Sequence, residues 1–280
     1  RDSSVPSAYI KRGCRSFRVD DTPSILDVMT KLVDLTGPQP KALIKKFQDR
    51  VVCDIIEYNM IHPKNVIDDS RKAAAIVSEV LRELAEATKP YAALAFLEEL
   101  AERRIREAGG IPISKGYHPD WAAEPFPATV CMSVNNEACH GIPGDRTLRP
   151  GDIITYDLGV RYNEGCGDAA FTVGVGALDN RKERLLRYAE RALTEAVKIV
   201  RAGIPVSAIG RVTEKVALVN GFTVIRDFGG HAIGAAMHEE PHIPHYYDAD
   251  DDHVYLEEGQ MICIEPMLTP GKGKIAIRDD

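Results

Sequence analysis

The sequence predicts an α+β fold built from two similar halves. Two pairs of amphipathic helical patterns, over residues 68–108 and 181–219, lie about 110 residues apart, and strand-like runs follow each pair. An apolar fraction of 44% with a charged fraction of 28% is typical of a protein that buries a core. We therefore expect pseudo-twofold symmetry between the halves, each with a helix pair and a sheet.

The predicted helices have recognisable ends. The acids and serine at 68–70 offer side-chain oxygens for an N-cap, and Pro90 stops the helix that follows. The second helix is expected over 92–108, before a pair of glycines. The other helices are expected over 181–202 and 207–219, and strands around 128–134, 152–160, 169–175, 222–226, 261–265 and 274–277.

The first 65 residues carry no motif to which chemistry can be attached. Short helical patterns over 25–35 and 41–58 flank a break at 37–40, where Gly and Pro interrupt the periodicity. We expect residues 1–65 to form a partly helical N-terminal extension and residues 66–280 to form the functional domain.

Charge and composition exclude several classes of function. The formal net charge is −7 and no face is dense in Lys or Arg, so no nucleic-acid partner is expected. No run approaches the roughly 18 apolar residues of a membrane helix, so no membrane association is expected. Six cysteines without a C-x-x-C pair predict reduced, mostly buried thiols in a cytoplasmic protein.

Two carboxylates indicate a bound cation. Residues 152–160 and 165–173 alternate as strands, and we expect a four-residue turn at 161–164 between them. Asp157 would then lie directly opposite Asp168, where Cβ atoms are about 4.5–5.5 Å apart and like charges destabilise the ladder. Either both acids face water, which screens the repulsion, or a cation lies between them. Small residues that would leave this face open favour the cation: Gly159, Gly165, Gly167 and Ala170.

Two further segments would supply the rest of a metal site. His231 lies in a glycine-framed turn, where backbone can approach closely, and His238 follows seven residues later. Glu265 ends an apolar run, and a buried charge there is costly unless it is paired or metal-bound. Asp157, Asp168, His231 and Glu265 thus offer three carboxylates and one imidazole, donors that suit Mn²⁺, Fe²⁺, Co²⁺ or Zn²⁺. A bridging carboxylate suits two ions about 3.5–4 Å apart.

Four motifs in series resemble the type I methionine aminopeptidases. They are Cys131–Pro143 with its His-Gly-Ile-Pro, the two acids eleven residues apart, Gly-His-x-Ile-Gly…His-Glu-x-Pro over 230–241, and Ile-Glu-Pro-Met at 264–267. The resemblance covers about residues 66–280 and implies the pita-bread fold of the creatinases and aminopeptidases. It also implies a metal-dependent hydrolase that removes the N-terminal methionine of nascent proteins and peptides, at the ribosome.

The same resemblance implies a role for each metal-binding residue. Asp157 would chelate one ion, Asp168 would bridge two, and His231 and Glu265 would complete the second site. Two divalent ions are implied, drawn from Co, Mn, Fe, Zn and Ni, and they would lower the pKa of a shared water so that hydroxide is available at neutral pH.

Catalytic and substrate-binding residues follow from the resemblance as well. His140 would lie beside the substrate amine, His238 would polarise the scissile carbonyl, and Glu265 would also handle a proton. An apolar slot with a soft thiol suits a methionine side chain. The residues implied around the substrate are Tyr117, His118, Cys131, His140, Met237 and His238.

The sequence departs from the family pattern in three places. Ala232 replaces a usual glycine, and Met237 stands where an aromatic residue is common. The family's last hairpin, with a second bridging glutamate and a tryptophan, would follow Asp280; the one tryptophan here is Trp121, and the acids at 248–252 are expected in a solvated loop. We therefore expect the chain as given to hold its metals weakly.

Two alternatives to this function stay open. A binding protein that keeps the pita-bread fold without catalysis would explain the last ligand's absence. A proline-directed relative, such as an aminopeptidase P or a prolidase, would share the fold, but the segment 131–143 favours the methionine branch.

Overall fold

The computed structural model describes residues 62–118 and 124–276. The sequence expectations for residues 1–61, for Trp121 and for residues 277–280 lie outside them. No helix in these described ranges is long and apolar enough to cross a membrane. The elements are α3 (Lys64–Ala87), α4 (Leu94–Glu107), β1 (Ile111–Pro112), β2 (Cys131–Val134), β3 (Ile153–Tyr162), β4 (Gly165–Gly174), α5 (Asn180–Ile199), α6 (Val206–Val219), β5 (Thr223–Val224), β6 (Gly229–Ala232), β7 (Glu239–Pro244), η2 (Ala249–Asp251), β8 (Ile262–Cys263) and β9 (Leu268–Thr269).

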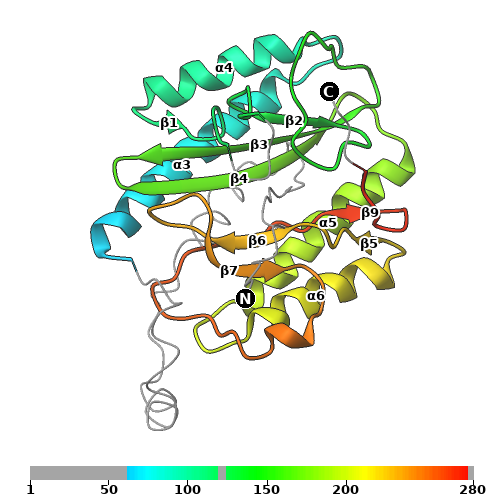
Figure 1. The fold of residues 1–280 in the computed structure, drawn as a ribbon. Helices are drawn as coiled ribbons and strands as arrows, with labels where there is room; N and C mark the ends of the chain where they lie inside the picture. Colours follow the sequence, from blue (N-terminus) through cyan, green and yellow to red (C-terminus); the bar gives the residue numbers. More distant parts are fainter. Residues whose placement is uncertain (1–61, 119–123, 277–280) are drawn as a thin grey trace, which may run out of the picture.

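The first half is a four-stranded antiparallel sheet covered on one face by α3 and α4 (Figure 1). Strand β3 pairs with β4 along one edge, while β1 and β2 share its other edge. Residues at alternate positions of β3, among them Tyr156 and Leu158, are fully buried in the main core. The opposite face of this sheet, which includes Asp157, is turned away from the helices.

Helix α3 begins earlier than the sequence indicates. It starts at Lys64, with Pro63 at the N-cap in an extended conformation, and no side-chain oxygen caps it. The expected cap at 68–70 is therefore wrong. Asp68 lies inside the helix and accepts hydrogen bonds from Lys64 and Arg71, one turn before and after it, at 2.5 and 3.2 Å. The end agrees with expectation, since Thr88 caps the helix two residues before Pro90.

Glycines in β4 allow α3 to pack directly on the sheet. A Cβ atom on Gly165 would collide with the backbone of Ser70, and one on Gly167 with the backbone of Ala74. Both glycines thus face α3. The expectation that they open the carboxylate face is wrong, because they alternate with Asp168 along the strand.

The β3–β4 hairpin is tighter than expected. Its turn has two residues, with Asn163 at φ +47°, and Tyr162 pairs with Gly165. This shifts the register by two positions, so that Asp157 lies opposite Ala170 and Gly159 lies opposite Asp168. The two aspartates share a face, as predicted, but they are diagonal neighbours and not directly opposed.

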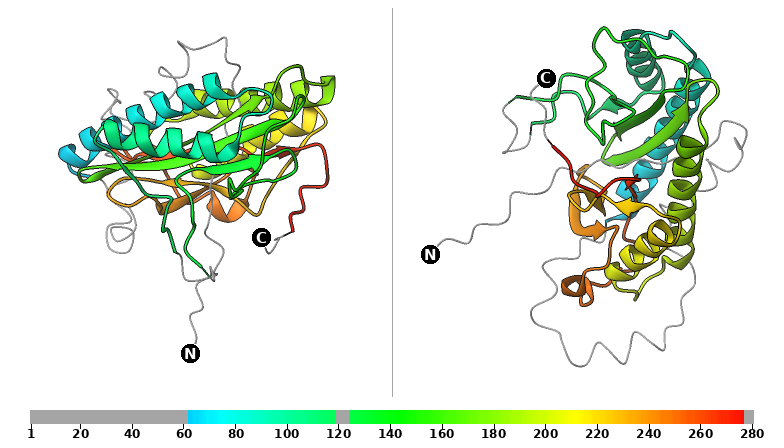
Figure 2. Two further views of the ribbon diagram at one scale, coloured as in Figure 1. Left: turned by 90° about the horizontal axis from the view of Figure 1, so that it is seen from above. Right: turned by 90° about the vertical axis from the view of Figure 1, so that its right-hand side faces the viewer.

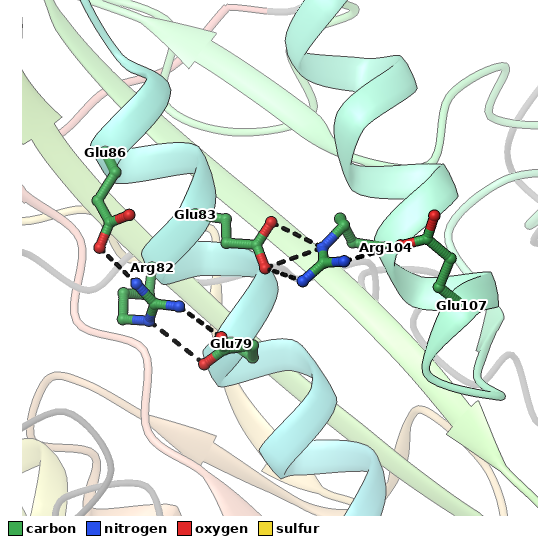
Figure 3. Close-up of polar contacts among 6 residues, drawn as sticks. All are labelled: Glu79, Arg82, Glu83, Glu86, Arg104 and Glu107. Carbon is green, nitrogen blue, oxygen red and sulfur yellow. Dashed lines mark hydrogen bonds and ion pairs between the residues drawn. The ribbon is translucent and has the colours of Figure 1, made fainter.

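Ion pairs join the two outer helices of this half (Figure 3). The Arg104 guanidinium on α4 donates to both carboxylate oxygens of Glu83 on α3, at 2.5–2.9 Å. Arg82 instead pairs with Glu79 and Glu86 on its own helix. The Arg104 contact therefore fixes one helix against the other, whereas the Arg82 contacts stabilise α3 alone.

The second half pairs α5 and α6 with short strands. Helix α5 begins one residue before the expected position, where the Asp179 side chain accepts from two backbone N–H groups at 2.9 Å, and it ends three residues early. Strand β6 lies between β7 and β8, and β5 pairs with β9. No strand occupies the described residues 274–276, so the expectation of a strand over 274–277 is wrong there. Strand β5 pairs with Leu268–Thr269 of β9.

The two halves share one core. Buried apolar residues of α3, α4, β2–β4, α5, α6, β6 and β8 form a single cluster. Figure 2 shows α3, α4, α5 and α6 on one side of the strands. The opposite faces of the two sets of strands carry the polar residues described next.

Candidate metal centre

Strands β2, β3 and β4 supply one wall of the site. Asp157 is 4% exposed and lies directly opposite Cys131 of β2, so both side chains leave the sheet on the face away from the helices. Asp168 leaves β4 on the same face, and its side chain is 5% exposed. Position 159, directly opposite Asp168, is a glycine, and a Cβ there would stand 2.9 Å from the Met237 sulfur. The missing side chain lets Met237 approach this wall.

The second wall comes from β6 and β8. His231 lies in the middle of β6 and pairs with Cys263 of β8. The expectation of a glycine-framed turn at His231 is therefore wrong. Both preceding glycines are extended, and a Cβ on Gly230 would collide with the backbone carbonyl of Cys263. They let β6 lie between two neighbouring strands.

The two walls converge on the His231 ring. Its Nε2 atom is 3.1 Å from Oε1 of Glu265 and 3.8 Å from Oδ2 of Asp168. Its Nδ1 atom lies 2.8 Å from the Ala232 carbonyl oxygen, which can only accept, so Nδ1 carries a proton. In the neutral ring the Nε2 lone pair therefore faces the two carboxylates.

Burial and charge compete at this histidine. Burial disfavours the imidazolium, but the hydrogen bond and the charge of Glu265, together with the charge of Asp168, outweigh it and raise the pKa of His231. Without a metal, Glu265 and Asp168 therefore favour a proton on Nε2 of His231. A divalent ion at Nε2 would replace that proton.

The donor set fits a divalent metal. In the neutral ring, Nε2 of His231 and Oε1 of Glu265 are both buried acceptors, and within residues 62–118 and 124–276 neither has a donor to satisfy it. Such groups are costly unless something else satisfies them. Potential ligand atoms form two groups, and within each group all of the atoms lie within 4.8 Å of one another. One group comes from Asp168, His231 and His238, and the other from His231, Cys263 and Glu265.

One more histidine lies beside His231, and another packs near the start of β6. The His238 ring lies 4.4 Å from the His231 ring, and its Nδ1 is 2.9 Å from the Tyr117 hydroxyl. His140 has a positive φ of +59° and stacks edge-on to Phe228, just before β6, at 5.9 Å. Asp168, His231, His238 and Glu265 thus come together from three distant segments, and Tyr117 reaches His238 from a fourth. His118, which follows Tyr117, is exposed.

A family model, that of metallopeptidase family M24, matches residues 68–280. The chain belongs to this family. Over 217 residues it is 35% identical to a methionine aminopeptidase of Clostridium perfringens, covering 78% of this chain and 84% of that protein. The fold is similar to that of a Thermotoga maritima methionine aminopeptidase, with a TM-score of 0.74, 31% identity and coverage of 79% and 86%.

The same fold extends to prolidases. The Pyrococcus furiosus prolidase matches with a TM-score of 0.63 and 20% identity, over 82% of this chain and 66% of that one, a likeness that concerns the fold alone. These likenesses confirm the predicted pita-bread fold and a metal-dependent hydrolase. The curated relatives favour the aminopeptidase over the proline-directed alternative.

Three residues of this M24 metallopeptidase escaped the sequence analysis. Cys263 faces the metal centre, and its position two residues before Glu265 in a strand-like run was a signal for that. His245, 1% exposed, accepts a hydrogen bond from the Glu265 backbone N–H at 2.8 Å and so fixes that residue. His62 is buried against Glu239, with Nε2 and Oε2 2.5 Å apart. No local pattern marks either histidine.

Proposed function

We propose that this M24 metallopeptidase removes the N-terminal methionine from peptides and nascent proteins. The observation that carries the proposal is the convergence of Asp168, His231 and Glu265, beside the His238 ring, in a chain that is similar to methionine aminopeptidases over most of its length. Cysteine thiols at Cys131, Cys139, Cys166 and Cys263 are consistent with action in the cytoplasm, with nascent chains at the ribosome as substrates.

The metal ligands in this proposal are Asp157, Asp168, His231 and Glu265. Their mixture of carboxylate and imidazole suits two divalent ions from the set Mn, Fe, Co, Zn and Ni. Bound ions would supply an activated water and neutralise developing negative charge. The chain itself holds Glu265 in place through the His245 hydrogen bond, which keeps its carboxylate directed at His231.

His238 is the electrophilic residue of the proposal. When the Tyr117 hydroxyl donates to Nδ1, the proton of a neutral His238 ring lies on Nε2. That N–H group can donate to the scissile carbonyl oxygen as it gains negative charge. Tyr117 thereby selects the tautomer, as second partners of catalytic histidines commonly do.

His140 and Glu265 handle the substrate amine and the leaving amine in the proposal. His140 is supported in this role by its contact with Phe228, just before β6, and its φ of +59° fixes the local backbone. A free amine on the substrate would lie beside it and beside the acidic centre, so cleavage is restricted to the first residue. Glu265, as a carboxylate in this centre, can pass a proton to the nitrogen that leaves.

The methionine side chain would lie against a soft, apolar wall. Cys131 and Met237 are 0% and 6% exposed and border the β2–β3 face, and Tyr117 contacts His238, the residue after Met237. Thiol and thioether groups are polarizable and suit an unbranched thioether substrate. His118 is expected at the rim of this pocket, because it is exposed.

Release of free methionine tests the proposal. The full chain would be stripped with chelator, reloaded with Mn²⁺ or Co²⁺, and assayed on peptides that begin Met-Gly, Leu-Gly, Ala-Pro or acetyl-Met. We expect metal-dependent release from the first peptide alone. The Asp168→Asn variant should be inactive, whereas Asp250→Asn, an exposed acid in η2, should match the parent.

Two outcomes would contradict the proposal. Preferential cleavage of the Ala-Pro peptide would assign the chain to the proline-directed branch. Tight binding of metal without hydrolysis of any peptide would indicate a binding protein.

A further inference from the structure

Cys263 has the position of a metal ligand. It lies in β8 directly across from His231, so the two side chains leave their strands on the same face. Its sulfur, the His231 nitrogen and a Glu265 oxygen all lie within 4.8 Å of one another. The residue is 8% exposed, as buried as His231 at 5% and Glu265 at 7%. Three ligand types of different hardness thus share one enclosed space.

An independent observation indicates that something binds in this space. The buried His231 Nε2 and Glu265 Oε1 atoms lie 3.1 Å apart, and in the neutral ring both are acceptors, so among the described residues neither satisfies the other without a cation between them. Their side chains are 6% and 9% exposed. The Cys263 sulfur also lies 3.9 Å from the backbone oxygen of Asp168, so it borders the wall that carries that acid.

We propose that Cys263 is a sulfur ligand of the ion held by His231 and Glu265, and that it makes this site selective for thiophilic ions such as Zn²⁺ over Mn²⁺. The inference rests on the proposed function for the presence of an ion, but not on the reaction. Tetrahedral zinc with bonds of about 2.1 Å to nitrogen and 2.3 Å to sulfur separates those atoms by about 3.6 Å. The observed separation, within 4.8 Å, is close to this value.

Binding converts the thiol to a thiolate. The S–H bond breaks, a sulfur–metal bond forms, and the thiol proton leaves to solvent. The ion thereby gains a thiolate ligand that carries one negative charge. With a hydroxyl or methyl group at this position, the ion would have only carboxylate and imidazole ligands. Harder ions such as Mn²⁺ accept those ligands as well as Zn²⁺ does.

Cadmium titration of the full chain tests the assignment, because thiolate–cadmium bonds absorb in the ultraviolet by charge transfer. The parent and Cys166→Ser, which removes a second buried thiol from the same apolar cluster, should both show the band, saturating with the ions bound at the centre. Cys263→Ser should lose the band. It should also bind Zn²⁺ about 10–100-fold more weakly and Mn²⁺ within a few-fold of the parent.

X-ray absorption of the zinc-loaded chain keeps the proposal falsifiable if Cys263→Ser does not fold. A sulfur neighbour at about 2.3 Å is expected in the parent and not in a second variant, Cys263→Ala. A shell of nitrogen and oxygen alone in the parent, or a sulfur signal that survives the loss of Cys263, overturns the assignment. Methionine release by the Mn²⁺-loaded chain without any sulfur signal would refute this inference and leave the proposed function standing. A sulfur signal without methionine release would support the Cys263 assignment and refute the proposed function.

Discussion

The two halves of the molecule contribute to the metal centre in different ways. The first half presents Asp157 and Asp168 on two ten-residue strands whose register runs through ten residue pairs. The second half presents His231, Cys263 and Glu265 on or beside strands of four and two residues. The long run of hydrogen-bonded pairs between β3 and β4 makes the first wall rigid. The second wall depends on close backbone packing and on side-chain contacts such as that of His245.

This difference predicts where a substitution acts. A change in the first half should act mainly on the free energy of unfolding, unless it touches an acid of the centre. A change in the second half should act mainly on metal affinity and turnover, because small shifts of its short strands move the ligands directly.

The largest effect is expected for the acids of the centre. Asp157→Asn or Asp168→Asn should abolish metal retention and lower methionine release at least about 100-fold, since a first ligand is lost. The apo protein should melt at or slightly above the parent temperature, because the diagonal arrangement makes the relieved repulsion small, at most about 0.2–1 kcal/mol. Metal content after gel filtration and melts with and without chelator measure both. Equal metal-induced stabilisation in variant and parent would refute the ligand assignment.

A matched pair of glycine variants tests the comparison most directly. Gly167→Ala should lower the free energy of unfolding by about 1–3 kcal/mol through its collision with α3, with little change in metal affinity per folded molecule. Gly230→Ala should push β6 from the Cys263 carbonyl and reduce metal affinity as well. Chemical denaturation and metal titration of both variants give the two quantities. The same loss of affinity in both would mean that the halves do not differ in this way.

A smaller effect is expected at His62. Its hydrogen bond fixes Glu239, which follows His238 and also accepts from the Ala236 backbone N–H at 2.8 Å. His62→Ala should lower kcat roughly 10-fold with metal retained, because the segment that carries His238 loses a fixed contact. His62→Gln, which keeps a donor, should recover part of the rate, and His253→Ala, at an exposed position, should match the parent.

The predicted N-terminal extension can be tested in the same experiment. Removal of residues 1–61 is expected to leave methionine release within a few-fold of the parent. Removal through His62 should add the loss seen for His62→Ala. A chain that becomes insoluble after the first truncation would show that the extension covers the core.

The smallest effect concerns Glu98 on α4, in the first half. Burial raises the pKa of this carboxyl, although the N–H groups of Thr129 and Val130 donate to it and partly oppose the shift. The folded protein therefore holds the proton more tightly than the unfolded chain, and the stability contributed by this group falls as pH rises above 4.5, its ordinary pKa.

Glu98→Gln should flatten that part of the pH dependence without changing metal affinity. Denaturation curves at several pH values above about 4 give the difference from the parent, and the exposed Glu99→Gln is the control. A variant whose stability falls with pH as steeply as that of the parent would show that the carboxyl ionises at its ordinary pKa.

The sequence indicated the regular parts of the fold because their periodicity is local. Helices α4, α5 and α6 lie within three residues of their expected ends, and Asp157 and Asp168 share a strand face. The helix start at Lys64 was missed because Pro63 begins the helix where no capping side chain marks it. Strand β6 was missed because a short, glycine-rich segment has no alternation of its own and becomes a strand only between β7 and β8.

By itself, the sequence determined which residue types this metallopeptidase offers to a metal and on which faces of its long strands they lie. Side-chain alternation depends only on the backbone of the strand itself. The tertiary structure alone decided the two-residue turn that makes the aspartates diagonal. It alone also brought Cys263 and His245 to the centre, and His62 to Glu239, which follows His238. Those contacts join segments that are far apart in the chain, and their geometry depends on how closely glycines such as Gly230 let separate backbones approach.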